Sequence, residues 1–143
     1  MSTRVVAPVV AAWFIGVAAA FGAVSRYQAP PVSGAATWPA DSVMAPATGV
    51  VNVVLFVDSD APAPRAKLGE LAELAALRSD VQVHVVIVRP GAAPRDAGDA
   101  LVERAAEIRG AQVFVDEGGQ EARRFGAAVG TTLVYGRDGA RQR

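Results

Sequence analysis

Cysteine is absent from the 143 residues of this chain. That absence excludes disulfide bonds, thiolate nucleophiles and thiolate metal ligands together. Histidine and lysine each occur once, at His84 and Lys67. A single imidazole has no partners for a catalytic triad or a histidine metal site, so we expect His84 to be a hydrogen-bonded strand residue. The chain offers few of the side chains that perform covalent or metal chemistry.

An excess of charge is also missing, because 14 basic and 14 acidic residues give a formal net charge of zero. The charges are scattered, and no cationic stripe is present that could neutralise a phosphate backbone. Nucleic acid is therefore not an expected partner. Apolar residues make up 52% of the chain, which is high for a soluble domain of this size. We expect part of the chain to meet lipid.

The apolar excess lies in the segment Val5 to Ser25, which Arg4 and Arg26 flank. About 20 helical residues match the roughly 30 Å hydrocarbon core of a bilayer, whereas the apolar part of a signal peptide is about 7 to 15 residues long. We predict a retained single-pass anchor over residues 1–26, in a bacterial inner (cytoplasmic) membrane, with the rest of the chain in the periplasm. A cleaved signal peptide is the alternative.

Three small residues, Ala12, Gly16 and Ala20, recur every four positions in this segment. On a helix they line one face, where a neighbouring helix can approach closely, so they are a candidate helix-docking seam. Chance spacing in an alanine-rich segment is the alternative. Residues 27–49 are rich in Pro and Ala and lack a helical or strand period, which predicts an extended linker. Trp38 is expected to anchor this linker on the following domain, and the membrane interface is the alternative.

Residues 50–143 alternate between strand and helix patterns. The predicted strands are 50–57, 81–88, 111–115 and 131–135, and the predicted helices are 64–77, 99–109 and 120–125. This alternation predicts an α/β domain whose first strands are parallel. Arg137-Asp138-Gly139 predicts a hairpin turn. Asp116 and Glu117 are expected to cap the helix that follows them, and contact with an anion or a metal is the alternative.

Four segments of this domain, in their order along the chain, match the sequence pattern of a known superfamily. They are VVLFVDSDAPAPRAKLGEL from Val53, HVVIVRPG from His84, DEGGQEARRFGA from Asp116 and GTTLVYGRDG from Gly130. From about Trp38 onward the chain resembles the thioredoxin-like superfamily, and within it the bacterial membrane-anchored thioredoxin-like proteins of the RedB type. The resemblance implies a three-layer α/β sandwich.

The resemblance also places an active site, at the turn between the first strand and its helix. Such proteins have Cys-Pro-Cys or Cys-x-x-Cys there, and the helix N-terminus stabilises the thiolate. This chain has Ala61, Pro62 and Ala63, so the turn is a vestigial active site and thiol-disulfide exchange is excluded. Gly130 and Thr131 stand where thioredoxins have a cis-proline, which is a second departure from the family pattern.

The superfamily pattern continues beyond the hairpin with a further strand and a covering helix, whereas this sequence ends at Arg143. We therefore expect a truncated sandwich, with one apolar sheet face and the edge of strand 131–135 left open. Such surfaces promote association. A neighbouring subunit, or the chain's own linker with Trp38, is expected to cover them.

Asp58 and Asp60 follow the first strand as an Asp-x-Asp pair. Such pairs hold metal and nucleophile in some phosphatases and glycosyltransferases. The phosphatase pattern needs Thr or Val where Pro62 stands and a lysine further downstream than Lys67. The two aspartates are therefore weak metal candidates, and a capped, solvated turn is the expected role.

The residues together predict a protein without enzymatic activity or a cofactor. We expect an accessory or structural subunit of a larger membrane complex, with a photosynthetic or respiratory electron-transfer complex as the suggested host. Its expected partners are the bilayer and other membrane subunits, contacted through the anchor and the exposed sheet edge. The alternative is a thiol-disulfide oxidoreductase or metal-handling thioredoxin-like protein whose cysteines have been replaced by Ala61 and Ala63.

Overall fold

The computed structural model describes residues 34–60, 64–96 and 98–142. They belong to the second of two units of the chain, Val32–Arg143. The predicted anchor and the first part of the predicted linker lie outside the described residues. Within the described ranges, no helix is long and apolar enough to cross a bilayer.

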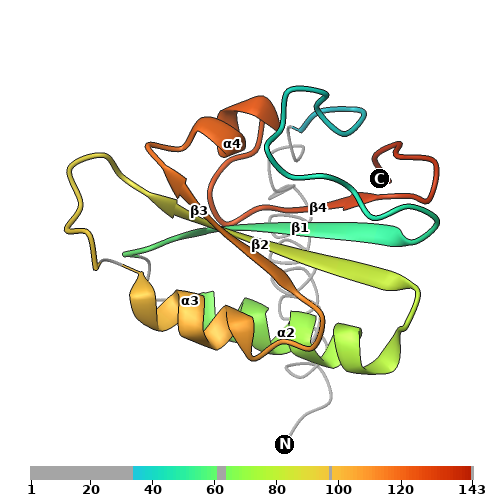
Figure 1. The fold of residues 1–143 in the computed structure, drawn as a ribbon, viewed down its shortest axis with the longest axis horizontal. Coiled ribbons are helices and arrows are strands. Elements are labelled where there is room, and N and C mark those ends of the chain that lie inside the picture. The colour runs from blue at the N-terminus through green and yellow to red at the C-terminus, as the bar shows by residue number, and fades with distance from the viewer. Residues whose placement is uncertain (1–33, 61–63, 97, 143) are drawn as a thin grey trace, which may run out of the picture. The chain divides into compact units, whose positions relative to one another are not determined.

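Four strands form one sheet, and three helices pack on it (Figure 1). The strands are β1 (Val51–Asp58), β2 (Val81–Arg89), β3 (Gln112–Glu117) and β4 (Thr132–Tyr135), and the helices are α2 (Pro64–Leu77), α3 (Asp99–Ala106) and α4 (Gln120–Arg124). The strand order is β3-β2-β1-β4, in which β1, β2 and β3 are parallel and β4 is antiparallel to β1. The predicted α/β domain with parallel first strands is confirmed.

The predicted elements agree with the observed ones within a few residues. The largest difference is in α3, which ends at Ala106 rather than Arg109. After Ala106 the hydrogen bonds span three residues instead of four, because the N–H of Ile108 bonds to the carbonyl of Ala105 at 3.1 Å. Gly110 then takes a positive φ of 71°, a conformation that glycine adopts without strain and that allows the chain to turn into β3.

Each face of β1 packs against its own layer. Val53, Leu55 and Val57 pack with the residues of α2 and α3, whereas Val54 and Phe56 point to the layer that contains α4. Because successive strand residues alternate between faces, a strand covered on both sides must be apolar throughout. This explains the continuous apolar run of the first predicted strand.

Residues 34–49 cover the second face of the sheet together with α4 (Figure 1). Met44 is only 2% exposed and accepts a hydrogen bond at its carbonyl from Nε1 of Trp38, at 2.9 Å. The Trp38 ring packs edge-on against the rings of Phe125 and Tyr135, with centroids 5.0 and 5.3 Å apart. The described part of the predicted linker is thus a layer of the domain, and Trp38 anchors it as expected.

The edge of β4 that was expected to be open is partly occupied. The turn at Gly139, whose φ is 77°, folds residues 140–142 back along β4. The N–H of Gln142 bonds to the carbonyl of Val134, and the N–H of Arg141 bonds to the carbonyl of Ala36, both at 2.8 Å. The expectation of a fully open edge at 131–135 is therefore wrong, because the hairpin returns the chain to its own edge.

Replacing Trp38 with alanine tests whether residues 34–49 are part of the cooperative fold. Removal of the indole leaves a gap between two aromatic rings, so we expect W38A to lower the free energy of unfolding by about 2–4 kcal/mol. The matched control is V43A in the same segment, where a side chain that is 71% exposed should change stability by less than about 0.5 kcal/mol. Urea unfolding followed by circular dichroism measures the free energy of unfolding of both variants. A loss of stability in W38A as small as that in V43A would show that the segment does not contribute to folding.

Candidate functional site

The end of β1 forms the turn in which the sequence placed an active site. Oδ1 of Asp58 accepts a hydrogen bond from the N–H of Asp60 at 2.9 Å, which closes a short turn after the strand. The N–H of Ser59 continues the pairing with β2 by bonding to the carbonyl of Val88 at 3.1 Å. Residues 61–63 lie outside the described residues, and α2 begins at Pro64.

A second loop lies beside this turn. The N–H of Gly130 bonds to the carbonyl of Phe56 at 2.7 Å, and the N–H of Phe56 bonds to the carbonyl of Thr131 at 2.9 Å. Nζ of Lys67, from the first turn of α2, donates to the carbonyl of Gly130. The end of β1, the beginning of α2 and the Gly130–Thr131 loop therefore meet at one place.

The side chains at this place support little chemistry. No thiol is available in a chain without cysteine, so the turn cannot exchange disulfides. One oxygen of Asp58 is engaged by the backbone of the turn, and Asp60 is exposed. Across the described part of the chain, no three His, Asp or Glu side chains are grouped as ligands for a metal ion. Asp58 and Asp60 act as turn residues in this geometry.

Asn52 and His84 form a buried polar pair on the face that residues 34–49 cover. Oδ1 of Asn52 accepts the N–H of Ala47 at 2.8 Å, and its Nδ2 donates to the carbonyl of Ala47 at 2.9 Å. These bonds fix the amide orientation, so Nε2 of His84, 3.0 Å from the same Oδ1, must carry the proton. Nδ1 of His84 is then an acceptor, and no donor among the described residues reaches it.

Burial lowers the pKa of His84 to about 4, because the charged imidazolium would lose its hydration beneath residues 34–49. The Trp38 ring packs edge-on over the imidazole, with centroids 5.1 Å apart. The imidazole is neutral at pH 7. His84 is hydrogen-bonded, as expected, at one of its two nitrogens.

Asn52 and Glu121 are structural polar residues that the sequence did not single out. Glu121 is buried and accepts hydrogen bonds from Oγ of Ser42 at 2.7 Å and from the N–H of Val43 at 3.3 Å, and it also pairs with Arg124. One amide inside an apolar strand is the signal that could have identified Asn52, since a buried amide needs partners. Glu121 gave no such signal, because the partners that bury it, Val43 and Ser42, are 78 and 79 residues away in the sequence.

Asp116 caps α4, as predicted. Its Oδ2 accepts the N–H of Ala122 at 2.9 Å, and its side chain is buried. An acidic side chain is favourable here, since the first N–H groups of a helix have no partner within the helix.

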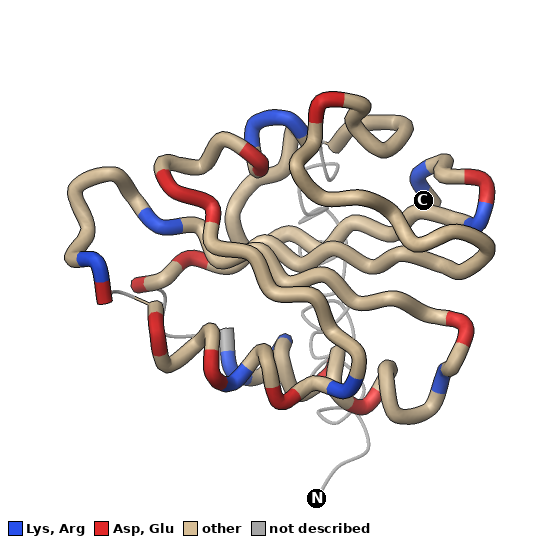
Figure 2. The backbone as a smooth tube through the Cα atoms, in the orientation of Figure 1, with Lys and Arg blue, Asp and Glu red and all other residues tan. Residues whose placement is uncertain are grey.

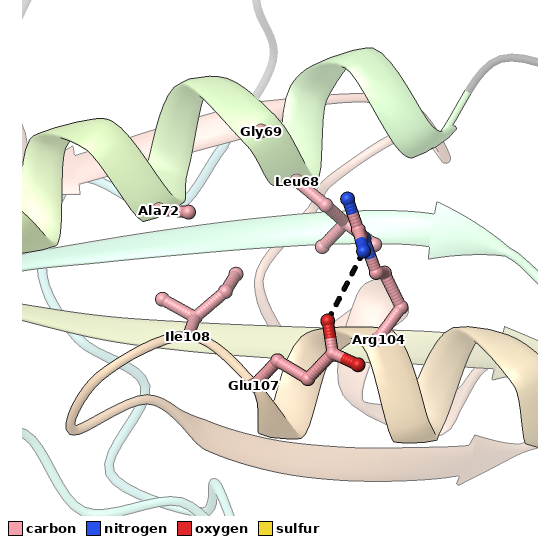
Figure 3. A pocket seen from close by; sticks show the side chains of 6 residues that line it. All are labelled: Leu68, Gly69, Ala72, Arg104, Glu107 and Ile108. Atoms are coloured by element: carbon pink, nitrogen blue, oxygen red, sulfur yellow. Dashed lines mark hydrogen bonds and ion pairs between the residues drawn. The ribbon is translucent and has the colours of Figure 1, made fainter.

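A groove of about 160 Å³ lies between α2 and α3 (Figure 3). Its lining residues are Leu68, Gly69, Ala72, Arg104, Glu107 and Ile108. Nη1 of Arg104 donates to Glu107 at 3.1 Å, so the charged groups at the groove are paired with each other. The groove holds no nucleophile, and the Asp58–Asp60 turn does not line it.

The predicted helix-docking seam of Ala12, Gly16 and Ala20 lies outside the described residues. The same holds for the vestigial turn of Ala61, Pro62 and Ala63. What the structure describes of the candidate site is its surroundings: the strand that leads into it, the helix that leaves it and the loop beside it.

These features define a three-layer α/β protein in which a mixed sheet has helices on both faces. Its fold is thioredoxin-like, as three solved structures show. A thioredoxin-like protein from Aeropyrum pernix has a TM-score of 0.55 and 13% identity, over 88% of each chain. A secreted Mycobacterium tuberculosis disulfide oxidoreductase homologous to E. coli DsbE has a TM-score of 0.51 and 20% identity, over 66% of this chain and 68% of that one.

The third structure is a putative protein disulfide isomerase from Bacteroides thetaiotaomicron. It has a TM-score of 0.51 and 13% identity, over 67% of this chain and 62% of that one. No protein-family model and no curated protein matches the sequence. At these identities the likeness establishes the fold and leaves the activity to be argued from the residues.

The buried imidazole predicts a pH dependence of stability. Below the ordinary pKa of 6.5 the unfolded chain binds a proton at His84 that the folded chain does not bind until about pH 4. The free energy of unfolding should therefore be constant above pH 6.5 and should fall by up to about 1.4 kcal/mol per pH unit between pH 6.5 and 4. The hydrogen bond from Arg78 lowers the pKa of Asp80. This group therefore adds to the pH dependence of stability only near and below pH 3.8, its ordinary pKa.

Urea unfolding at half-unit pH steps measures this slope. H84Q removes the only histidine and should remove most of the slope between pH 6.5 and 4, whatever its stability at pH 7. An unchanged slope in H84Q would assign the pH dependence to other groups.

Proposed function

We propose that this chain is a membrane-anchored thioredoxin-like protein without redox activity, serving as an accessory or structural subunit of a larger membrane complex. The observation that carries the proposal is the replacement at the vestigial site. A thioredoxin-like strand ends at Asp58 and a helix begins at Pro64, and the sequence between them has Ala61 and Ala63, in a chain without any cysteine. The scaffold is kept where the reactive group is absent.

The buried carboxylates of the domain support a structural role. The described carboxylates on the buried side, Asp116 and Glu121, hold α4 and residues 42–43 in place. In this proposal the apolar segment Val5 to Ser25 is the anchor, in a bacterial inner membrane, and the domain lies on the periplasmic side. Other membrane subunits would contact Ala12, Gly16 and Ala20, and an electron-transfer complex, photosynthetic or respiratory, is the proposed host.

A second candidate is a thiol-disulfide oxidoreductase or metal-handling protein whose two cysteines have been replaced by alanine. The observation that favours it is the geometry around the turn, because β1, α2 and the Gly130–Thr131 loop meet as they would around a working thiol pair. Two of the similar structures are described as a disulfide oxidoreductase and a putative disulfide isomerase.

Restoring the thiols separates the two candidates. The wild-type chain should reduce insulin no faster than buffer does. We expect A61C/A63C to react with maleimide, because helix N-termini favour thiolates, but to show little insulin turnover. The matched control is the single variant A61C, which has a thiol without a partner. Turnover by the double variant many times that of the single one would favour the second candidate.

Alkaline carbonate washing tests the proposed anchor. The full chain should stay in the membrane pellet, and protease added from the periplasmic side should digest the domain. A mature N-terminus at Arg26 would instead identify a cleaved signal peptide.

The seam is tested in the same membranes with G16L, which fills the groove between small residues. We expect a smaller assembly on native gels with unchanged insertion. V17L is the control, since it changes a neighbouring position outside the seam. Equal mobility of both variants and the wild type would remove the docking role of the seam.

A further inference from the structure

Residues 34–49, which we call the cover segment, lie on one face of the sheet without belonging to any of its four strands (Figure 1). Bonds within the segment hold it together. Nε1 of Trp38 donates to the carbonyl of Met44 at 2.9 Å, and the N–H of Met44 donates to Oγ of Ser42 at 3.0 Å. The segment precedes β1 in the chain, so it can leave the sheet without drawing any strand with it.

The rest of the domain has a core that does not use the cover segment. The core between the sheet and the helices α2 and α3 contains Val53, Leu55 and Val57 of β1, and no described residue of the segment takes part in it. The ladders that join the four strands do not include the segment either. Proteins open locally in cooperative units, at a lower free energy than that of global unfolding. The cover segment has the contacts of such a unit.

His84 lies in the middle of β2, beneath the cover segment. Its side chain is fully buried, its Nε2 donates to Oδ1 of Asn52, and the Trp38 ring packs edge-on over it. Its Nδ1 has no hydrogen-bond partner among the described residues. A second proton would have to bind to Nδ1, where the new N–H would be buried without an acceptor. The closed arrangement therefore favours the neutral imidazole.

The charged groups of the elements around His84 are engaged elsewhere. Figure 2 shows that β1 and β2 carry charge only at their carboxyl ends, at Asp58 and Arg89. Asp116 in β3 accepts a hydrogen bond from α4, and Glu121 in α4 accepts two from the cover segment. Burial alone lowers the pKa of His84. The remaining titratable groups of these elements form the pairs Arg89–Glu117, Arg124–Asp41, Arg123–Gly118, Tyr135–Ala35 and Arg141–Gly34.

We propose that the cover segment is a pH-sensitive switch, which leaves the sheet when the His84 imidazole takes up a proton, while the four strands and the helices α2 and α3 stay folded. Opening returns the imidazole to water, where both N–H groups of the charged ring are hydrated. Opening also exposes the apolar face that Phe125 and Tyr135 share with β1. The inference does not depend on the proposed function.

Hydrogen exchange in the full chain, purified in a mild detergent, measures the opening. The N–H of Ala47, which bonds to Asn52 at 2.8 Å, reports on the attachment of the cover segment, and the N–H of Val43 reports on it independently. The pKa of His84 is about 4 when it is buried and 6.5 when it is free. After correction for intrinsic exchange, the protection of both N–H groups should therefore fall by about 50-fold between pH 7 and 4.5.

Urea distinguishes release of the cover segment from global unfolding, which takes up the same proton. Release exposes less surface, so the protection of the Ala47 N–H should depend much less on urea than that of the N–H groups in the β1–β2 ladder. It should also be lower than theirs at every pH. Equal protection and equal urea dependence would overturn the proposal, because the segment would then not open by itself. This comparison needs no variant.

Two variants test whether His84 is the group that takes up the proton. H84Q should abolish the fall in protection of the Ala47 N–H between pH 7 and 4.5. E121Q is the matched control, because it weakens another attachment of the same segment. It should lower protection at every pH and keep the fall. A fall that persists in H84Q, or one that disappears in E121Q, would overturn the proposal. If H84Q does not fold, the urea comparison in the wild-type chain decides.

Discussion

Burial of both faces of β1 requires a covering layer on each side of the sheet. The long helices α2 and α3 cover one face. On the other face α4 has only five residues, which is too short to cover strands of eight and nine residues. Residues 34–49 complete that layer, and the hydrogen bonds of Asn52 to both backbone groups of Ala47 hold them on the sheet. The second core depends on this attachment.

The same attachment explains why polar side chains lie inside an otherwise apolar protein. A covering segment without regular structure leaves backbone groups that must be paired once water is excluded. Asn52 and Glu121 supply those partners, and Asn52 in turn fixes the proton of His84 on Nε2. The buried polar groups that the structure describes therefore serve the scaffold, and Asn52, His84 and Glu121 are separate from the turn at the end of β1.

Local sequence patterns were enough to predict the elements, because each strand and helix has its own apolar period. The helix Pro64–Leu77 has the predicted bounds, and the glycines at 110 and 139 mark turns that the structure contains. No local period could predict the packing of residues 34–49, since their contacts join residues up to 107 positions apart. The vestigial turn could be located by its surroundings, but alanine carries no functional group from which a new chemistry could be read.

The two edges of the sheet differ in a way that bears on assembly. Residues 140–142 occupy part of the edge of β4, whereas within the described residues no strand pairs with the outer side of β3. A strand that pairs with an open edge exchanges bonds to water for bonds to protein, so its net gain comes mainly from burying side chains. At β3 the exposed side chain that such pairing would bury is that of Val115, whereas at β4 the chain itself has already taken up part of the edge.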